Sequence, residues 1–358
     1  MPHLGFALEY SLGHTTHAQN LKRALTRYPE ITPTYVDLPY DGIPGAWTRL
    51  PGVRSNWSLR ASAGAWLGMR RHIRHLDGAL YHTQVTSLLA AGLMRQVPSV
   101  ISLDATPLQY DALGAFYGHV PSTNARLESL KKRLNQRAFG AARRLVAWSE
   151  WAKASLVADY GVAPDKITVI PPGIDTGLWR RERPARAAGP LRLLFVGGDF
   201  PRKGGETLLS AFERLPPGLA ELTIVTKTPL TGNKLLNVTV RQDVQPNSEA
   251  LLQLYADADV FVFPTRGDCL PLAVMEALTS GLPVVTTTVG ALPEAVTHGE
   301  TGWIVPPDDP AALADALLAL AADRALLSRL SAQAAEVGRE RFSAATNYGR
   351  LIEVVLGK

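Results

Sequence analysis

The chain has 358 residues, 46% of them apolar and 19% charged, which is the composition of a folded globular protein large enough for two hydrophobic cores. With one cysteine, Cys269, and no fixed-period repeat, the sequence excludes a disulfide scaffold and a repeat protein. The N-terminus lacks the features of a secretory signal, and no run reaches the roughly 18 apolar residues needed to span a bilayer. We therefore expect a cytoplasmic protein.

The net charge of +5 is divided unevenly along the chain. Residues 1–170 hold 19 Lys and Arg against 11 Asp and Glu, a net +8, whereas the remainder holds 18 against 21, a net −3. Two basic stretches, 59–76 and 127–145, have helical patterns. They are either helices with a basic outer face or amphipathic helices on the anionic inner face of the membrane, with Trp66 and Phe139 as anchors.

The first half alternates between strand-like and helix-like apolar patterns, less regularly than the second half. Strands are predicted over residues 4–10, 31–38, 78–84 and 98–107, and residues 167–175 end this half. Helices are predicted over residues 16–29 and from residue 124 onward, the latter running into a strand near residue 149.

The second half alternates regularly between continuous apolar strands and amphipathic helices. The predicted strands are 191–198, 220–226, 259–265 and 283–288, and the predicted helices are 204–216, 247–258, 271–281 and helices within 310–342. Strands that are buried on both faces and alternate with helices are typical of a parallel, doubly wound sheet.

The fold class is therefore α/β, with two Rossmann-like, doubly wound parallel-sheet domains facing a central cleft. We expect an N-terminal acceptor-side domain over residues 1–175, a Pro-, Gly- and Arg-rich linker over 176–189, and a C-terminal domain over 190–340. A last helix, 341–358, is expected to pack back toward the first domain. In such sheets ligands bind beyond the carboxyl ends of the strands, so the residues after each strand are the functional candidates.

A glycine-rich segment, residues 196–205, follows a predicted strand and opens a helix. It is not a dinucleotide fingerprint, which disfavours a dehydrogenase. Gly197 and Gly198 allow close approach of the backbone to a ligand, and Arg202 and Lys203 stand where a helix N-terminus already favours an anion. The segment is either a diphosphate clamp or a glycine-rich turn with solvated cations.

Two carboxylates, Asp268 and Glu276, lie eight positions apart in the apolar segment 266–285. Because burying an unpaired carboxylate is costly, Glu276 is expected to accept hydrogen bonds from a ribose diol, and Asp268 to reach sugar hydroxyls. The alternatives are an exposed helix residue and a loop-capping aspartate. Backbone groups between them, expected to approach a phosphate, belong to Cys269, Leu270, Pro271 and Leu272.

Residues 191–209 and 258–310 resemble the nucleotide-sugar domain of retaining glycosyltransferases of family 4, and 148–175 resembles the end of that family's first domain. The resemblance implies the GT-B fold. It also implies that Asp268 and Glu276 stand for the family's Glu-x7-Glu signature, in which the first carboxylate positions the donor sugar and the second holds the ribose. Arg202 and Lys203 would then be the pair that binds the diphosphate. Asp268 is one methylene shorter than the family's glutamate, and Gly198 and Asp199 stand where many members have an arginine.

The acceptor side is expected in the first half. Gly13, His14 and His17 occupy the place of the family's glycine-rich first loop, with a polar turn as the alternative. Asp104 retains the acid of a His-Asp pair and is expected to orient an acceptor hydroxyl, unless it only caps a strand end. Further residues proposed to line the acceptor path are Tyr110, Tyr117 and His119.

The expected function is a glycosyltransferase (EC 2.4) that moves a sugar from a nucleoside-diphosphate sugar to a hydroxyl of a glycan, lipid or small molecule. The expected catalytic residues are Asp268, Lys203, Arg202 and Asp104, and the segment around Val244 is expected to read the base. Retention of anomeric configuration is implied by the resemblance. No cofactor or metal is expected, since no residues have metal-ligand spacing, and no nucleic acid, since no recognition motif is present. The alternatives are an epimerase or hydrolase of the same fold and a non-catalytic nucleotide-sugar binder.

Overall fold

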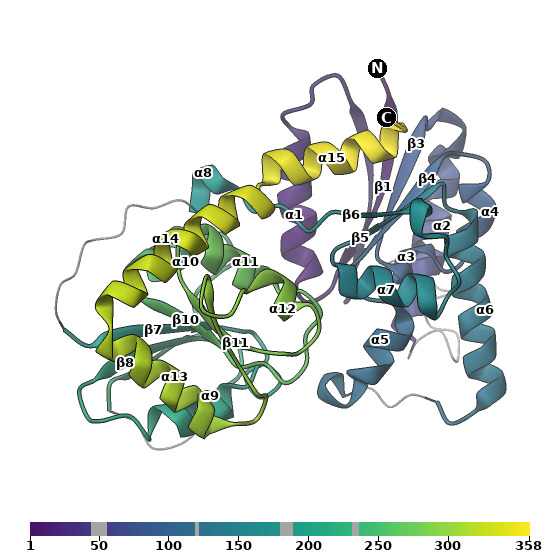
Figure 1. Cartoon of the computed structure of the whole chain (residues 1–358). Helices are drawn as coiled ribbons and strands as arrows, with labels where there is room; N and C mark the ends of the chain where they lie inside the picture. The colour runs from purple at the N-terminus through teal and green to yellow at the C-terminus, as the bar shows by residue number, and fades with distance from the viewer. Residues whose placement is uncertain (44–55, 119–121, 180–188, 231–235) are drawn as a thin grey trace. The chain divides into compact units, whose positions relative to one another are not determined.

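The computed structural model describes residues 1–43, 56–118, 122–179, 189–230 and 236–358 (Figure 1). The chain divides into two compact units. Unit 1 comprises Met1–Gly173 together with Ala344–Lys358, and unit 2 comprises Ile174–Ser343. Each unit is built around one six-stranded sheet in which every strand pair is parallel, so the predicted α/β architecture is confirmed.

The sheet of unit 1 has the strand order β2-β1-β3-β4-β5-β6. Its strands are β1 His3–Tyr10, β2 Thr32–Pro39, β3 Gly78–His82, β4 Ser99–Leu103, β5 Arg144–Ala147 and β6 Ile167–Val169. Successive residues of the central strands enter opposite hydrophobic clusters, as Leu80 does on one side and Ala79 and Tyr81 do on the other. The sheet is therefore buried on both faces, which explains its nearly continuous apolar strands.

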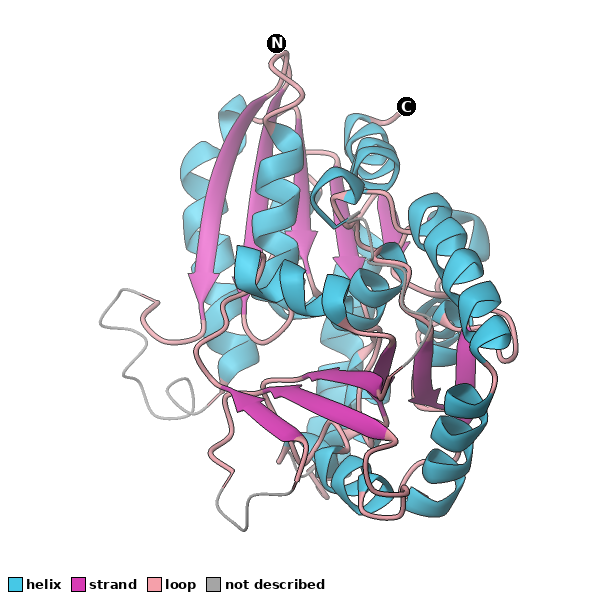
Figure 2. Cartoon of the chain, turned by 90° about the vertical axis from the view of Figure 1, so that its left-hand side faces the viewer, coloured by secondary structure: helices cyan, strands magenta, loops and turns pink. Residues whose placement is uncertain are grey.

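Helices cover both faces of this sheet (Figures 1 and 2). The α-helices of unit 1 are α1 His14–Leu25, α2 Trp57–His72, α3 Gln84–Ser87, α4 Ala91–Met94, α5 Pro107–Ala112, α6 Ala125–Ala141, α7 Glu150–Ala158 and α15 Ala344–Leu356. The described residues of the unit also form the short 3-10 helices η2 Ile73–His75, η3 Gly114–Tyr117 and η4 Pro164–Lys166. The two basic stretches noted in the sequence thus correspond to α2 with η2 and to α6.

The C-terminal helix α15 packs on α1, β3 and β4, and its Tyr348 and Leu351 belong to the same hydrophobic cluster as Leu21. The backbone at Gly173 packs closely against Ala344, the first residue of α15. A Cβ added there would lie 2.4 Å from Cα of Ala344, so only glycine fits.

The sheet of unit 2 has the strand order β12-β11-β10-β7-β8-β9. Its strands are β7 Leu191–Val196, β8 Ala220–Val225, β9 Val238–Arg241, β10 Val260–Phe263, β11 Val284–Thr287 and β12 Gly302–Val305. Its helices are α8 Thr176–Trp179, α9 Gly205–Phe212, α10 Glu249–Asp257, α11 Leu272–Thr279, α12 Leu292–Ala295, α13 Pro310–Ala322 and α14 Arg324–Arg341. The sequence patterns did not predict β9 or β12. Both are outermost strands and only partly buried, so their apolar signal is weak.

None of the helices in the described ranges combines the length and apolarity needed to cross a bilayer.

Candidate active site

In unit 2, the loops that follow β7 and β10 meet at the carboxyl edge of the sheet, because these two strands are neighbours. Gly204, which ends the first loop, has a φ of +76°, and a Cβ there would lie 1.8 Å from the carbonyl oxygen of Pro264. The Arg202 carbonyl accepts hydrogen bonds from the Arg266 amide (3.0 Å) and the Thr265 hydroxyl (3.2 Å). The two loops therefore form one hydrogen-bonded structure.

Arg202 is buried between these loops. Its Nε donates to Oδ2 of Asp199 at 3.0 Å, and its Nη1 donates to the Gly267 carbonyl at 2.8 Å. The guanidinium thus ties the first loop to the second and brings a positive charge to the carboxyl edge of the sheet.

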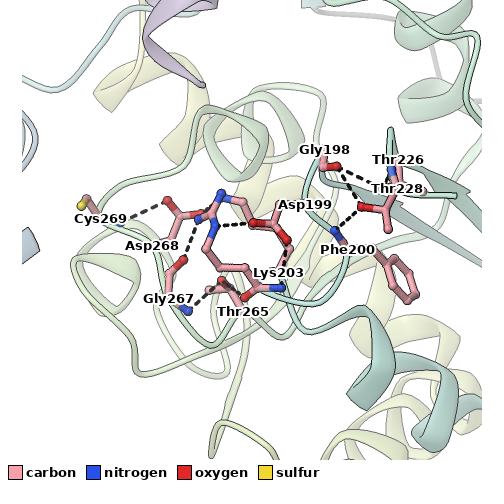
Figure 3. Close-up of polar contacts among 11 residues, drawn as sticks. Gly198, Asp199, Phe200, Lys203, Thr226, Thr228, Thr265, Gly267, Asp268 and Cys269 are labelled. Carbon is pink, nitrogen blue, oxygen red and sulfur yellow. Dashed lines mark hydrogen bonds and ion pairs between the residues drawn. The ribbon is translucent and has the colours of Figure 1, made fainter. Parts of the chain in front are cut away.

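Lys203 and Asp268 form an ion pair at the same edge, with Nζ of Lys203 donating to Oδ2 of Asp268 (Figure 3). The ammonium also lies 5.1 Å from the centre of the Phe263 ring. Burial and then the charge of Arg202 lower the pKa of the Lys203 ammonium, whereas the Asp268 carboxylate in contact with it favours the charged form. The other carboxylate oxygen of Asp268 accepts from the Cys269 amide at 3.1 Å.

The segment between the signature carboxylates leads into the N-terminus of α11. Its residues Cys269, Leu270, Pro271 and Leu272 are all buried. Among the described residues, no side chain caps this helix end and no acid lies in its first turn, so its backbone amides and dipole favour an anion. Gly290, with a φ of +59°, holds the segment in place, since a Cβ there would lie 2.2 Å from the Asp268 carbonyl oxygen.

Glu276 lies in the middle of α11 and is only 6% exposed. Its Oε2 accepts a hydrogen bond from the Tyr255 hydroxyl at 3.4 Å. Burial raises the pKa of Glu276 to about 7, although the hydrogen bond from Tyr255 opposes the shift. A buried carboxylate with one weak partner retains capacity to accept hydrogen bonds from a ligand hydroxyl pair.

The remaining predicted donor residues are placed as follows. Gly197 is buried and donates to the Val225 carbonyl at 2.9 Å, whereas Gly198 is exposed. Val244 is half-buried in the loop between β9 and α10. Sequence reasoning missed Thr228, which follows β8 and donates to the Gly198 carbonyl at 3.2 Å while accepting from the Phe200 amide at 3.1 Å.

In unit 1, His14 and Asp104 come together beyond the carboxyl ends of β1 and β4. Nε2 of His14 lies 3.7 Å from Oδ2 of Asp104, and the two side chains are 17% and 18% exposed. Nδ1 of His14 lies 3.1 Å from Nε2 of His82. The buried His82 thus fixes His14, and both side chains of the His14–Asp104 pair keep some exposure to solvent.

His17 is placed differently from His14, because it lies on the inner face of α1 and is 1% exposed. Its ring stacks on His82 at 4.4 Å, and its Nδ1 lies 3.2 Å from the Tyr348 hydroxyl. Burial lowers its pKa to about 3, so the ring is neutral. The structure therefore places the His17 side chain in the core, where it packs between His82 and Tyr348.

The other acceptor-side candidates form no single group. Gly13 precedes α1 with open space around it, and Tyr110 packs against Tyr117 with ring centres 4.9 Å apart. His119 lies outside the described residues. Sequence reasoning also missed Glu9, a buried carboxylate that accepts hydrogen bonds from the Thr83 hydroxyl and from Nε1 of Trp57 (2.8 Å).

Within the residues that the structure describes, no three His, Cys, Asp or Glu side chains come together in a way that could hold a metal ion.

Two protein families match the chain. Residues 13–178 match the family described as Glycosyltransferase Family 4, and residues 190–323 match the family described as Glycosyl transferases group 1. The D-inositol 3-phosphate glycosyltransferase of Streptomyces bingchenggensis is 30% identical over 347 residues, covering 88% of this chain and 73% of that protein. The enzyme of the same name from Corynebacterium efficiens is 36% identical over 219 residues, and there the alignment covers 54% of this chain and about half (51%) of the relative.

Solved structures show the same fold at lower sequence identity. Sucrose-phosphate synthase from Thermosynechococcus elongatus has a TM-score of 0.76 at 18% identity, and Anabaena HepE in complex with UDP and glucose has 0.71 at 16%, each covering all of both chains. WaaG, a glycosyltransferase involved in lipopolysaccharide biosynthesis, has 0.67 at 15%, with 99% of this chain and 100% of that chain covered. The predicted GT-B fold is thereby confirmed.

Proposed function

The chain belongs to glycosyltransferase family 4 and is a retaining glycosyltransferase that uses a nucleotide-sugar donor, and we propose that unit 2 binds this donor as a UDP-sugar. The observation that carries the proposal is the cluster of Arg202, Lys203 and Asp268 beside the uncapped N-terminus of α11. UDP is chosen because the HepE structures contain UDP and UDP-glucose.

The cations would neutralise the diphosphate. Arg202 and Lys203 bring two positive charges to the carboxyl edge of the sheet, and the first turn of α11 adds backbone amides. As the bond between the anomeric carbon and the phosphate oxygen breaks, the electron pair leaves on the diphosphate, where this charge is already in place. Positioned donors of this kind typically contribute about 10²- to 10³-fold in rate.

The two signature carboxylates would hold the rest of the donor. Glu276 is buried with Tyr255 as its hydrogen-bond partner, and its free lone pairs suit a ribose diol. Asp268 is held by Lys203 and by the Cys269 amide, so its position is fixed before a sugar arrives. A sugar hydroxyl that donates to Asp268 would share the carboxylate with the Lys203 ammonium.

On unit 1, we propose that His14 and Asp104 orient the acceptor hydroxyl. They form a half-buried pair at the carboxyl edge of the sheet, where ligands of such sheets bind. In the transfer step the hydroxyl oxygen bonds to the anomeric carbon on the face that the diphosphate leaves, and its proton passes to the departing phosphate. Because the relatives are named D-inositol 3-phosphate glycosyltransferases, a phosphorylated cyclitol is the first acceptor to test, followed by glycan and lipid acceptors.

We place this activity in the cytoplasm, which the single, buried Cys269 supports because it suits a reducing compartment. We also propose a peripheral membrane contact through the basic unit 1, which vesicle binding would test.

A thermal-shift panel of UDP-, GDP- and ADP-sugars tests the donor, since a ligand that binds only the folded state raises Tm. The sugar that raises Tm is then incubated with D-inositol 3-phosphate, and the anomeric configuration of the product is read by NMR. A UDP-sugar that raises Tm and yields a product with retained configuration supports the proposal. Conversion of the donor without any acceptor would indicate an epimerase or hydrolase instead, and a shift with GDP- or ADP-sugars alone would refute the choice of UDP.

A further inference from the structure

A basic groove of about 730 Å³ lies on unit 1, away from the candidate active site. It is formed where the end of α2 and η2 pack beside α4, which Figure 1 shows on the same side of the unit. The residues that line it include Trp66, Arg70, Arg71, Arg74, His75 and Gln96.

The groove and the acceptor-side pair lie at opposite edges of the sheet of unit 1. Helix α2 and η2 end just before β3 begins, and α4 ends just before β4 begins, so the groove is at the amino edge. His14 and Asp104, by contrast, follow the carboxyl ends of β1 and β4. A ligand in the groove would therefore be neither the acceptor nor the donor of the proposed reaction.

The segment that builds the groove is almost free of acids. Residues 42–103 contain seven arginines, no lysine and a single acid, Asp77. That carboxylate accepts a hydrogen bond from the backbone amide of His3 at 2.8 Å. The positive charge of the groove is thus not compensated by its own part of the chain.

The arginines of the groove are available for a ligand. Arg70, Arg71 and Arg74 are exposed, and across the described part of the chain no ion pair to any of the three is found. The guanidinium of Arg70 lies 5.0 Å from the centre of the Trp66 ring, which holds it over one wall of the groove. Three like charges around one concavity repel one another, and an anion relieves that repulsion.

Arginine forks match the oxygens of a phosphate group in a bidentate manner, which a lysine cannot do. We propose that this groove binds a phosphate-bearing anion, through Arg70, Arg71 and Arg74, at a site separate from the donor and acceptor sites. The anion is either the headgroup of an anionic lipid or a soluble phosphorylated compound. Trp66 and the apolar wall residues Ile73 and Leu93 would contact the part that carries the phosphate.

The test compares the full chain with two variants of equal charge change. The groove variant is Arg70→Gln/Arg71→Gln/Arg74→Gln. The matched control is Lys132→Gln/Arg133→Gln/Arg137→Gln, on the exposed face of α6. Circular dichroism and Tm confirm that both fold. Phosphate taken up by the proposed donor site on unit 2 is affected by neither variant, so a difference between them reports the groove alone.

One arm measures co-sedimentation with phosphatidylglycerol-containing vesicles and with pure phosphatidylcholine vesicles. The other arm measures calorimetric binding of glycerol 3-phosphate and inorganic phosphate. We expect the groove variant to lose at least tenfold in affinity in one arm while the control stays within twofold of the unaltered chain. Loss with vesicles alone identifies a lipid headgroup, and loss with glycerol 3-phosphate or inorganic phosphate identifies a soluble ligand. Absence of binding in both arms, or an equal loss in both variants, overturns the proposal.

Discussion

The ammonium of Lys203, in the loop after β7, donates to the carboxylate of Asp268, in the loop after β10, and so joins two residues that lie 65 positions apart in the sequence (Figure 3). Each residue neutralises the other in a place where a lone charge would be poorly solvated. A donor that brings its own diphosphate and hydroxyls can share both partners. The ion pair therefore fixes the two side chains in the absence of a ligand. Both charged groups could still interact with a bound donor.

We expect Lys203→Gln to lower kcat by about 10²- to 10³-fold, because it removes a positive charge that would, in the proposed mechanism, face the departing diphosphate. Loss of its partner also leaves Asp268 as a buried carboxylate without its ion pair, which should lower the free energy of unfolding by roughly 1–3 kcal/mol. The double variant Lys203→Gln/Asp268→Asn should recover most of that stability and none of the activity. Steady-state transfer rates and urea unfolding measure the two effects. The exposed Lys227→Gln serves as control, and full activity of Lys203→Gln would contradict the assignment.

Glu276→Gln should separate stability from donor binding. Burial raises the pKa of Glu276 from its ordinary 4.5 to about 7, so the folded state holds the proton more tightly than the unfolded state. The resulting stabilisation is complete below about pH 4.5 and is lost as the pH rises through 7, by about 3 kcal/mol. Glutamine cannot ionise, so the variant does not lose this stability as the pH rises. We therefore expect the variant to be the more stable protein at pH 8 and not at pH 4, as thermal unfolding at the two pH values would reveal.

The same variant should bind the donor at least tenfold more weakly at pH 8, because an amide accepts fewer hydrogen bonds from a diol than a carboxylate does. Donor affinity of the unaltered chain should rise between pH 6 and 8 as Glu276 ionises. Calorimetric titration with the donor at several pH values measures both trends. A pH-independent affinity, equal in chain and variant, would exclude contact between Glu276 and the donor.

The regular strands were predictable because a parallel sheet buried on both faces leaves a continuous apolar run, as in β7 and β10. The loops after those two strands were predictable as candidate sites for a related reason, since glycines and charged residues interrupt the apolar pattern there. The apolar pattern of the sequence could not predict that the Arg202 guanidinium donates a hydrogen bond to the Gly267 carbonyl. Such a contact depends on how two loops distant in sequence fold against each other.

The two histidines of α1 show why the surroundings of a single residue could not be predicted from the sequence. His14 and His17 are three positions apart, so a helical pattern gives them similar directions. In the structure His14 reaches Asp104 at the edge of the sheet, whereas His17 is enclosed by His82 and Tyr348. The difference arises because α15 covers this face, and Tyr348 comes from the far end of the chain.

Two glycines in the loop after β7 should respond differently to substitution by alanine, because one is sterically crowded and the other is exposed. Gly204→Ala places a Cβ 1.8 Å from the Pro264 carbonyl oxygen at a φ of +76°, and we expect it to cost at least about 2 kcal/mol of stability. Gly198→Ala meets no atom within 4 Å, so its stability should be unchanged. Donor affinity should nevertheless fall in Gly198→Ala if the diphosphate approaches this exposed backbone. Chemical unfolding and thermal shift with donor are the measurements, and equal stability of both variants would contradict the geometry.

The last prediction concerns the two residues of the proposed acceptor side. His14→Gln and Asp104→Asn should each lower kcat/KM for the acceptor by about 10- to 100-fold, because each removes one of the two groups that would hold the hydroxyl. Donor affinity should stay unchanged, since the proposed donor residues all lie on unit 2. His72→Gln, at the end of α2, is the matched control. If the two residues act as one unit, the double variant should be little worse than either single variant. Additive losses would show that the two residues act independently, and a loss of donor affinity would move the pair to the donor site.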